Sequence, residues 1–384
     1  MLKRVVNILA LGLVAAAMAA CAPSAAPEAG TVTTGDGGDK WEAAVAAAKK
    51  EGKLVWVTHT DLVYREMAQD FQKAHPDIQL DHQQIRPSEF APKLLTEQQN
   101  GLFTYDLWSS PTSNMVTVAL PAGAFQSLEP YLIRPDVKDP SNYRGNKLLW
   151  ATKEPLILLD RGNVDGGVYV NRDVLSKAQF SSLDQLMDAS LKGKITIRTP
   201  DAPHGGSLNL TGFLNTKGEK WLEQFMTEQQ PQYIENARLL TQNLINGKVG
   251  LAIGVDGATL DQCQVNGGCK NIEQIKGWQY LLGNGLSVLK NAPHPNATAV
   301  MVNWLMSKAG RESYIKGVLA TTPAPFSAAH SNRKDVEPHA DAVKEGAVPD
   351  YDNLSKYSLQ GMEQGNAHME FVINTYRKIE RGGR

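Results

Sequence analysis

Five clusters of polar residues, each at the end of a short apolar run that resembles a strand, carry the side chains best suited to hold a small solute. They are Thr58, His59 and Thr60; Trp108, Ser109 and Ser110; Asp160 and Arg161; His204, Gly205, Gly206 and Ser207; and Asp256 and Gly257. Hydroxyls, backbone amides and one guanidinium are the groups that a small polar or anionic solute needs. Because ligands of open parallel sheets bind outside the carboxyl ends of the strands, these clusters form a candidate binding site.

The chemistry of three clusters is specific enough to state. The glycines of 205–207 would expose backbone amides at a helix N-terminus, which favours a phosphate or a carboxylate. Arg161 can make a planar two-pronged contact to an oxyanion, and Trp108 can stack on a ring or a cation. The structural alternatives stay open: Trp108 as a core residue, Arg161 bridged to Asp160, Asp256 as a helix cap, and the two histidines as ordinary loop residues.

The sequence offers little support for catalysis. It contains no G-x-S-x-G, G-x-x-x-x-G-K-[ST] or H-E-x-x-H motif, and no G-x-G-x-x-G after a strand. Asp160 and Asp256 could form a distant pair of acids, although nothing in the sequence fixes their separation, so an exported hydrolase remains an alternative. The His, Cys and carboxylate residues have no compact metal-ligand spacing. We therefore expect no enzyme, no cofactor and no metal site.

The stretch Lys53–Ile78 shows which elements must position these clusters. Leu54–Val57 is an apolar run of strand length, and the polar turn 58–61 follows it. An apolar stripe at helical spacing then ends at His75-Pro76, before the next strand. The same alternation continues to about residue 120. This order predicts an α/β fold with parallel strands covered by helices.

The length of the chain predicts two lobes. Of its 384 residues about 345 remain once residues 1–38 are set aside, which is more than one compact core usually holds. We expect a first lobe of residues 39–151 plus 277–384 and a second lobe of residues 152–276. The mostly helical tail, 308–384, is expected to pack back on the first lobe.

The first 21 residues have the form of an export signal. A basic start at Lys3 and Arg4 precedes the apolar stretch Val5–Ala17, which is short for a membrane span, and Cys21 follows small residues. This arrangement resembles the lipobox of bacterial lipoproteins, which implies that Cys21 is lipidated and holds the protein on a membrane surface. A plain signal peptide is the alternative. Residues 22–38 are small, polar and rich in Pro and Gly, as in a flexible tether.

Charge and cysteine content limit the possible partners. With 39 Lys and Arg against 40 Asp and Glu, the formal net charge is −1, which argues against a general nucleic-acid binder because such a protein needs a basic face. Cys263 and Cys269 lie in a short loop rich in Gly and Asn. In an exported protein such a pair predicts a disulfide.

Three further stretches carry a family resemblance: Trp41–Lys53, Phe71–Ile78 and Pro293–Lys308. Together they resemble the extracellular solute-binding proteins of bacterial ABC importers, of the two-lobed type II periplasmic-binding-protein kind. The branch includes binders of ferric ion, thiamine, polyamines and phosphorylated metabolites. The similarity extends over about residues 40–325 and is poorly specific for the ligand.

The resemblance implies a fold and a function. Each lobe should have a central, mostly parallel sheet flanked by helices, with a ligand cleft between the lobes that the five clusters face. The protein would be a monomer that delivers its solute to a membrane permease. Ferric-ion capture and a surface ligand sensor remain alternatives. Ferric-ion binders of this kind use two adjacent tyrosines, whereas Tyr233, Tyr280 and Tyr314 stand alone, which argues against iron.

Overall fold

The computed structural model describes most of the chain. The described residues are 31–33, 40–165, 168–202, 205–257, 259–260, 263, 266–275, 280–321, 329–344, 348–352 and 362–382. The leader with Cys21, most of the expected tether, and His204 lie outside the described residues. Among the residues that are described, no helix is long and apolar enough to cross a membrane.

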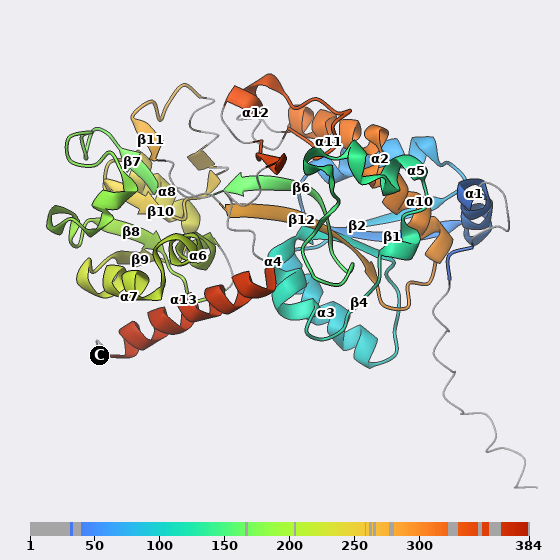
Figure 1. Ribbon diagram of the computed structural model, residues 1–384, viewed down its shortest axis with the longest axis horizontal. Helices are drawn as coiled ribbons and strands as arrows, with labels where there is room; N and C mark the ends of the chain where they lie inside the picture. Colours follow the sequence, from blue (N-terminus) through green and yellow to red (C-terminus); the bar gives the residue numbers. More distant parts are fainter. Residues whose placement is uncertain are drawn as a thin grey trace, which may run out of the picture.

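Seven strands form the first sheet, in the order β2-β1-β3-β12-β6-β5, with β4 paired to β12 (Figure 1). Their bounds are β1 Lys53–Thr58, β2 Gln79–Gln84, β3 Leu107–Pro111, β4 Phe125–Gln126, β5 Leu149–Trp150, β6 Leu158–Asp165 and β12 Tyr280–Leu289. β1 is parallel to β2 and β3, whereas β12 is antiparallel to β3 and β6. The sheet is therefore mixed rather than mostly parallel, because β12 brings the chain back from the second sheet.

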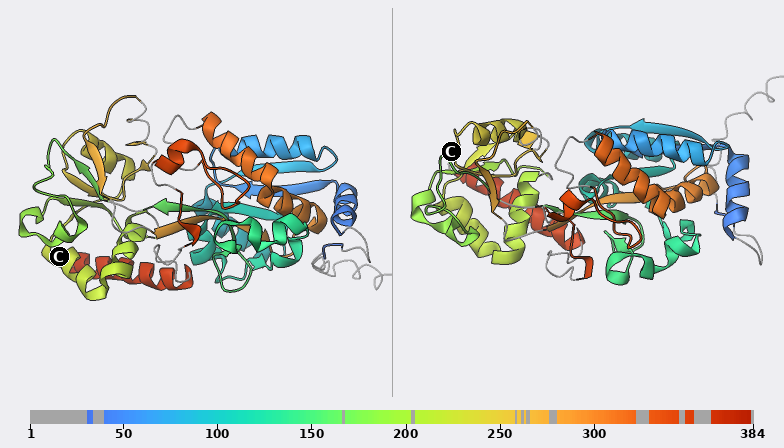
Figure 2. Two further views of the ribbon diagram at one scale, coloured as in Figure 1. Left: turned by 45° about the horizontal axis from the view of Figure 1, so that its top comes forward. Right: turned by 90° about the horizontal axis from the view of Figure 1, so that it is seen from above.

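Five strands form the second sheet, in the order β11-β7-β10-β8-β9. Their bounds are β7 Val168–Asn171, β8 Ile195–Arg198, β9 Gln232–Ile234, β10 Leu251–Ile253 and β11 Ile272–Ile275. β8 is parallel to β9 and β10, and β7 is antiparallel to β10 and β11. The two sheets belong to two bodies that lie side by side, and β6 and β12 run between them (Figures 1 and 2).

Helices cover both sheets. Around the first sheet lie α1 Lys40–Glu51, α2 Val63–Ala74, α3 Pro87–Gln99, α4 Thr112–Asn114, α5 Pro135–Lys138, α10 Pro295–Met306, α11 Lys308–Thr321 and α12 Ala340–Lys344, with the short turns η1 Met115–Ala119, η2 Glu129–Tyr131, η3 Pro140–Asn142 and η4 Arg144–Asn146. Around the second lie α6 Gly205–Lys217, α7 Glu219–Glu228 and α8 Ala237–Ile245, with η5 Leu183–Met187 and η6 Ala189–Leu191. The last helix, α13, is Met362–Gly382.

The pattern at Lys53–Ile78 folds as the sequence predicts. Strand β1 is buried on both faces: Leu54 belongs to one hydrophobic core, and Val55 belongs to the core on the other face of the sheet. In α2, the apolar stripe that includes Met67 and Phe71 is buried, and the helix ends before Pro76. Alternating side chains on one strand thus reach two cores, which leaves no solvated face on β1.

Two segments lie elsewhere than predicted. Residues 155–159 were expected in the second lobe, but β6 pairs with β12 and β5 in the first sheet. The end of the tail was expected on the first lobe, but α13 packs on α6 and α7, and Val372 is buried in the core of the second lobe. Other parts of the tail do lie on the first lobe, where α11 packs against α2. The remaining lobe boundaries stay a prediction.

Candidate functional site

The carboxyl ends of β1 and β3 lie side by side at one end of the first sheet. The two strands are parallel, with Thr58 opposite Ser109. Strand β12 runs antiparallel between β3 and β6, and this pairing brings Arg161 of β6 to the same end. Three of the predicted clusters therefore meet here, although they are up to about 100 residues apart in the sequence.

The second sheet presents its own carboxyl ends to this group. Val168, the first residue of β7, is separated from the end of β6 by only two residues, and β10 is antiparallel to β7. The carboxyl ends of β10 and its parallel neighbour β8 consequently point back toward the first sheet. Helix α6 begins at Gly205 after β8, and Asp256 follows β10. We call the region where these ends face those of β1 and β3 the seam.

The hydroxyl groups of the first lobe differ in their availability. Ser109 Oγ accepts a hydrogen bond from Trp56 Nε1 at 2.9 Å, and Thr58 Oγ1 donates to the carbonyl oxygen of His59 at 2.9 Å. Ser110 Oγ is buried and has no hydrogen-bond partner among the described residues. Ser110 Oγ is thus a fully buried hydroxyl whose hydrogen-bonding capacity is unused in the described structure.

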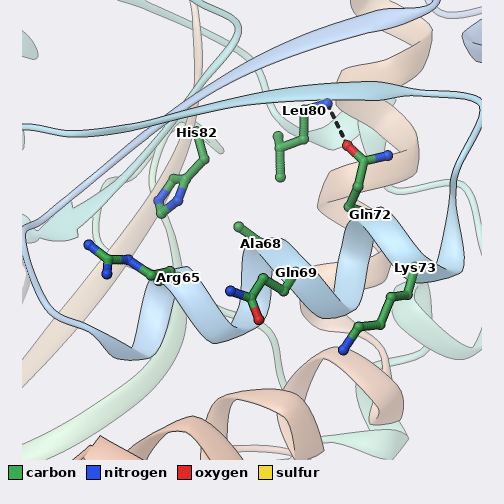
Figure 3. A pocket seen from close by; sticks show the side chains of 7 residues that line it. All are labelled: Arg65, Ala68, Gln69, Gln72, Lys73, Leu80 and His82. Atoms are coloured by element: carbon green, nitrogen blue, oxygen red, sulfur yellow. Dashed lines mark hydrogen bonds between the residues drawn. The ribbon is translucent and has the colours of Figure 1, made fainter.

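Thr58 is held in place by a histidine that lines an adjacent groove. His82 Nε2 lies 2.8 Å from Thr58 Oγ1, and burial, followed by the positive charge of Arg65, lowers the pKa of His82 to about 4. His82 is therefore neutral at pH 7. It lines a groove of about 420 Å³ between α2 and β2 (Figure 3), whose other lining residues are Arg65, Ala68, Gln69, Gln72, Lys73 and Leu80. This groove follows α2 and β2 along the first lobe, so it is distinct from the turns of the seam.

The turn after β1 carries an ion pair at its rim. His59 Nδ1 lies 3.1 Å from Asp61 Oδ1. The hydrogen bond to Asp61 raises the pKa of His59, partly opposed by burial. For Asp61, burial acts to raise the pKa, but the hydrogen bond and charge of His59 and the charge of Arg161 outweigh it, so the net pKa is lowered. Thr60, between them, is exposed to solvent.

Arg161 is buried and almost fully oriented by its neighbours. Its guanidinium carbon lies 4.1 Å from the centre of the Tyr314 ring, and its Nη1 lies 3.4 Å from both carboxylate oxygens of Asp160. The predicted bridge to Asp160 therefore exists. Arg161 Nε nevertheless lacks a hydrogen-bond partner among the described residues. Burial lowers the pKa of Arg161, but the attraction of Tyr314 and Asp160 outweighs burial and raises it, so the side chain stays charged.

A second guanidinium, which the sequence analysis missed, shares the same carboxylate. Arg311 of α11 is fully buried, its Nη1 lies 3.0 Å from Asp160 Oδ2, and its Nε donates to the carbonyl oxygen of Leu305. Two buried cations thus face one carboxylate. The spacing of Arg311 and Tyr314, three residues apart on one helix, places them on one face, but nothing in the sequence links that face to Asp160.

Trp108 is a core residue, which was the structural alternative to a stacking role. Its indole is fully buried and packs edge-on against Phe90, with ring centres 5.0 Å apart. It belongs to the hydrophobic core on one face of the first sheet. Neighbouring residues of a strand point to opposite faces, so Trp108 turns away from the side on which Leu107 and Ser109 lie. The structure shows no surface of this ring toward the seam.

The predicted glycine-rich cluster of the second lobe lies at the start of α6. A Cβ atom at Gly206 would come within 2.3 Å of the Arg198 carbonyl oxygen, so only glycine lets the helix start this close to the end of β8. Ser207 is buried, and its Oγ donates to the carbonyl oxygen of Ala202 at 2.7 Å. Gly205 is the first residue of the helix. That this turn exposes backbone amides to a ligand stays a prediction, and His204 lies outside the described residues.

The carboxylate of Asp256 contacts two nearby side chains. Its carboxylate accepts a hydrogen bond from Thr259 Oγ1 at 2.5 Å and lies 3.9 Å from Arg238 Nε. A helix cap would instead accept a backbone N–H, so the capping alternative for Asp256 stays a prediction. Cys263 and Cys269 are joined by the predicted disulfide.

Of the three tyrosines considered for an iron site, the two with described side chains lie in different lobes. Tyr314 is buried under Arg161, Tyr233 packs against Tyr376 in the second lobe, and the side chain of Tyr280 lies outside the described part. In the part of the chain that is described, no group of three His, Cys, Asp or Glu side chains could hold a metal ion.

Comparison with known proteins identifies similar sequences and folds. The family model for bacterial extracellular solute-binding proteins matches residues 66–342. An uncharacterized protein of Haemophilus influenzae is 26% identical over 153 residues, which are 38% of this chain and 44% of that protein. The chain thus matches less than half the length of this relative.

Three solved structures illustrate the similarity of fold. An ABC transporter protein of Clostridium perfringens is 16% identical with a TM-score of 0.62, over 85% of this chain and 99% of that one. A ferric binding protein of Campylobacter jejuni is 15% identical with a TM-score of 0.61, over the same shares. The periplasmic binding protein AfuA of Actinobacillus pleuropneumoniae, solved with fructose-6-phosphate, is 19% identical with a TM-score of 0.56, again over 85% and 99%.

Proposed function

The chain belongs to the bacterial extracellular solute-binding proteins, and we propose that it captures a small polar or anionic organic solute at the seam and delivers it to the membrane permease of an ABC importer. Membership confirms the resemblance found in the sequence and places the chain among exported proteins. The structural neighbours likewise confirm a two-lobed α/β fold. The solute, the residues that contact it and the partner permease belong to the proposal.

An excess of positive charge beside the seam is the observation that supports an anionic solute. Arg161 and Arg311 share the single carboxylate of Asp160. A buried charge without a partner is costly, and an added anion offsets that cost. Because Arg161 Nε is unpaired in the described structure, an oxyanion at this point would complete its hydrogen bonds as well as balance its charge.

The other predicted residues would surround the rest of the solute. Ser110 offers a buried hydroxyl, and His59 and Thr60 form the rim of the first lobe. From the second lobe, the start of α6 at Gly205 adds backbone amides and the partial positive charge of a helix N-terminus. Movement of the lobes about β6 and β12 would bring the two sides together around the solute.

The proposal extends to the attachment of the protein. Lipidation of Cys21, followed by the tether 22–38, would keep the exported protein, as a monomer, at the membrane surface near its permease. The support for this step is the lipobox-like sequence of the leader. Binding rather than catalysis is proposed because the sequence contains no G-x-S-x-G or H-E-x-x-H motif and the matched family consists of solute-binding proteins.

A thermal-shift screen of carboxylates, phosphorylated metabolites, amines and sugars tests the function. A solute at 100 times its dissociation constant adds about 2.7 kcal/mol to the free energy of unfolding. We expect a carboxylate or a phosphorylated compound to stabilise the protein, and Arg161→Gln to weaken its binding about 10- to 100-fold. Lys220→Gln, an exposed change in α7 with the same loss of charge, is the control.

Two outcomes would contradict the proposal. Stabilisation only by neutral sugars or amines, with the same affinity in Arg161→Gln, would reject the anionic solute. An absence of any shift across the whole screen would reject solute binding itself. Circular dichroism of the free variants shows whether Arg161→Gln has kept the fold.

A further inference from the structure

Strand β6 carries a β-bulge at Asp160. Its pairing with β12 shifts register between Asn284 and Gly285, so Asp160 has no counterpart on β12. Neighbouring residues of a regular strand point to opposite faces of the sheet, but the extra residue of a bulge breaks that alternation. Asp160 and Arg161 consequently both contact side chains of α11. The bulge therefore places an acid and a base side by side against one helix.

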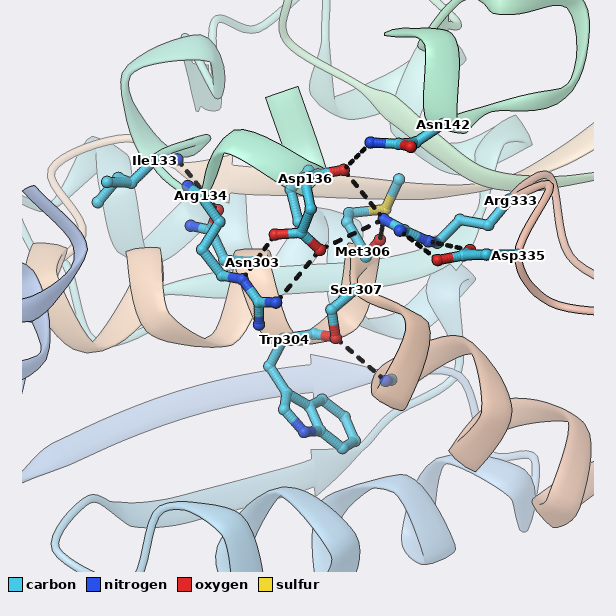
Figure 4. Close-up of polar contacts among 12 residues, drawn as sticks. Ile133, Arg134, Asp136, Asn142, Asn303, Trp304, Met306, Ser307, Arg333 and Asp335 are labelled. Atoms are coloured by element: carbon cyan, nitrogen blue, oxygen red, sulfur yellow. Dashed lines mark hydrogen bonds and ion pairs between the residues drawn. The ribbon is translucent and has the colours of Figure 1, made fainter. Parts of the chain in front are cut away.

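The start of α11 fixes the guanidinium that meets this bulge. Ser307 Oγ accepts a hydrogen bond from Gly310 N at 3.3 Å, and buried Arg333 donates to the carbonyl oxygen of Met306 at 3.1 Å (Figure 4). Arg311 follows directly, its backbone N donates to the carbonyl oxygen of Ser307 at 3.0 Å, and its side chain is fully buried. The turn between α10 and α11 thus sets the position of Arg311 beside the bulge.

The buried groups around the bulge carry a net positive charge of one. Arg161 and Arg311 are both cations, because a guanidinium does not lose its proton in proteins, and they share the single carboxylate of Asp160. Tyr314, which lies under Arg161, is uncharged because burial raises its pKa to about 12. His330 is uncharged at pH 7, because burial, followed by nearby positive charge, lowers its pKa to about 3. Neither ring alters the charge of the guanidinium pair.

Two other charged groups near the bulge are balanced. At the rim of the seam, the hydrogen bond to Asp61 raises the pKa of His59, so the charges of this pair cancel at pH 6. A separate cavity of about 350 Å³ is lined by two cations and two carboxylates, Arg144, Lys334, Asp350 and Asp352. The uncompensated charge therefore lies on the two guanidiniums that share Asp160.

We propose that Asp160 and Arg311 determine the charge of the solute that Arg161 accepts, so that the seam takes an anion with one negative charge, such as a monocarboxylate, in preference to a dianion. The inference rests on the proposed function, because it takes the solute to bind at the seam. One negative charge neutralises the guanidinium pair, whereas a second would be buried without a partner, which is costly. Asp160 and Arg311 act through Arg161, so both are positioning residues.

Titration calorimetry of the full chain with acetate and sulfate at pH 6 tests this proposal. Acetate carries one negative charge and sulfate two, and we expect the wild type to bind acetate more tightly. Asp160→Asn leaves two uncompensated guanidiniums, so it should raise the affinity for sulfate about 10-fold or more and reverse the preference. Arg311→Gln should lower the affinity for acetate about 10-fold or more, because Asp160 then neutralises Arg161.

Three further variants separate charge from packing. The double variant Asp160→Asn/Arg311→Gln again has a net positive charge of one and should recover the wild-type preference for acetate, which a loss of packing at Arg311 could not produce. Arg311→Lys keeps the charge and should keep the affinity for acetate. Lys308→Gln removes a positive charge from an exposed position of α11 and should bind both anions as the wild type does, because solvent and salt screen that charge.

The outcomes distinguish this proposal from the proposed function. If Arg161→Gln weakens the binding of acetate while Asp160→Asn keeps the wild-type preference, the seam binds an anion but Asp160 does not select its charge, and the proposal is overturned. No recovery of the preference in the double variant would overturn it as well. No binding of either anion by the wild type at about 50 mM would reject the anionic function itself, and this proposal with it.

The test does not depend on the folding of Asp160→Asn. Circular dichroism of each free variant shows whether it has kept the fold. Should Asp160→Asn unfold, the comparison of Arg311→Gln with Arg311→Lys decides, because both change the packing at Arg311 and only the first removes its charge. Equal affinities of these two variants for acetate would then overturn the proposal.

Discussion

At the scale of single residues, the pair His294–Asp106 ties three elements together. Buried Asp106 accepts hydrogen bonds from Val55 N at 2.8 Å and from His294 N at 2.7 Å, and His294 Nδ1 lies 2.8 Å from Asp106 Oδ2. The carboxylate thus joins β1, the start of β3 and the entry to α10. The hydrogen bond to Asp106 raises the pKa of His294, partly opposed by burial.

This pair predicts a stability that depends on pH. A histidine whose pKa is raised by folding stabilises the protein fully below its unfolded pKa and loses that contribution as the pH rises through its folded pKa. We expect His294→Gln to cost about 1–3 kcal/mol at pH 5, and less at pH 8. Urea unfolding at the two pH values measures the difference.

A histidine with the opposite shift provides the control. Burial, then the charges of Lys49 and Arg134, lower the pKa of His75, so the contribution of its ring should change with pH in the opposite direction to that of His294. The same cost of His294→Gln at pH 5 and pH 8 would contradict the role assigned to the charged pair.

At the scale of elements, α13 connects the lobes. It packs along α6 and α7 in the second lobe, and it also contacts η1 in the first (Figure 2). Arg377 Nη2 donates to the carbonyl oxygen of Asp201 at 3.0 Å, close to the start of α6. The family model ends at residue 342, so this helix lies outside the matched region.

Truncation of one side chain on α13 should therefore destabilise the second lobe. Val372 is fully buried in its core, so we expect Val372→Ala to lower the free energy of unfolding by about 1–3 kcal/mol. Guanidinium unfolding followed by far-UV circular dichroism measures this loss. Glu370→Ala, an exposed change on the same helix, should have little effect, and equal costs for the two variants would contradict this packing.

At the scale of the whole molecule, the attachment of the exported chain can be tested directly. We expect the precursor with Cys21→Ser to leave the membrane fraction, because no lipid can then be attached to the mature N-terminus. Detergent phase partitioning of cell fractions measures this. A variant with both Cys263→Ser and Cys269→Ser, which keeps Cys21, should remain membrane-bound. Identical partitioning of the Cys21→Ser and wild-type proteins would reject the anchor.

The local pattern of the sequence determined much of this molecule. The apolar run Leu54–Val57 and the helical stripe after it give β1 and α2, because the spacing of apolar residues selects the period of the backbone. The same logic located the polar turns at strand ends, and the parallel pairing of β1 with β3 then brought Thr58 and Ser109 together. The family resemblance was likewise recognised from the sequence.

Only the tertiary structure decided which part of the molecule packs on each face of a strand or helix. β3 is buried on both sides, so alternation alone could not place Trp108 in the core. Likewise the apolar stripe of α13 specifies a buried face but not that the second lobe covers it. Arg311 and Asn332 contact β6 from 150 or more residues away in sequence. Local propensity carries no information over that distance, because such contacts form only when the whole chain packs.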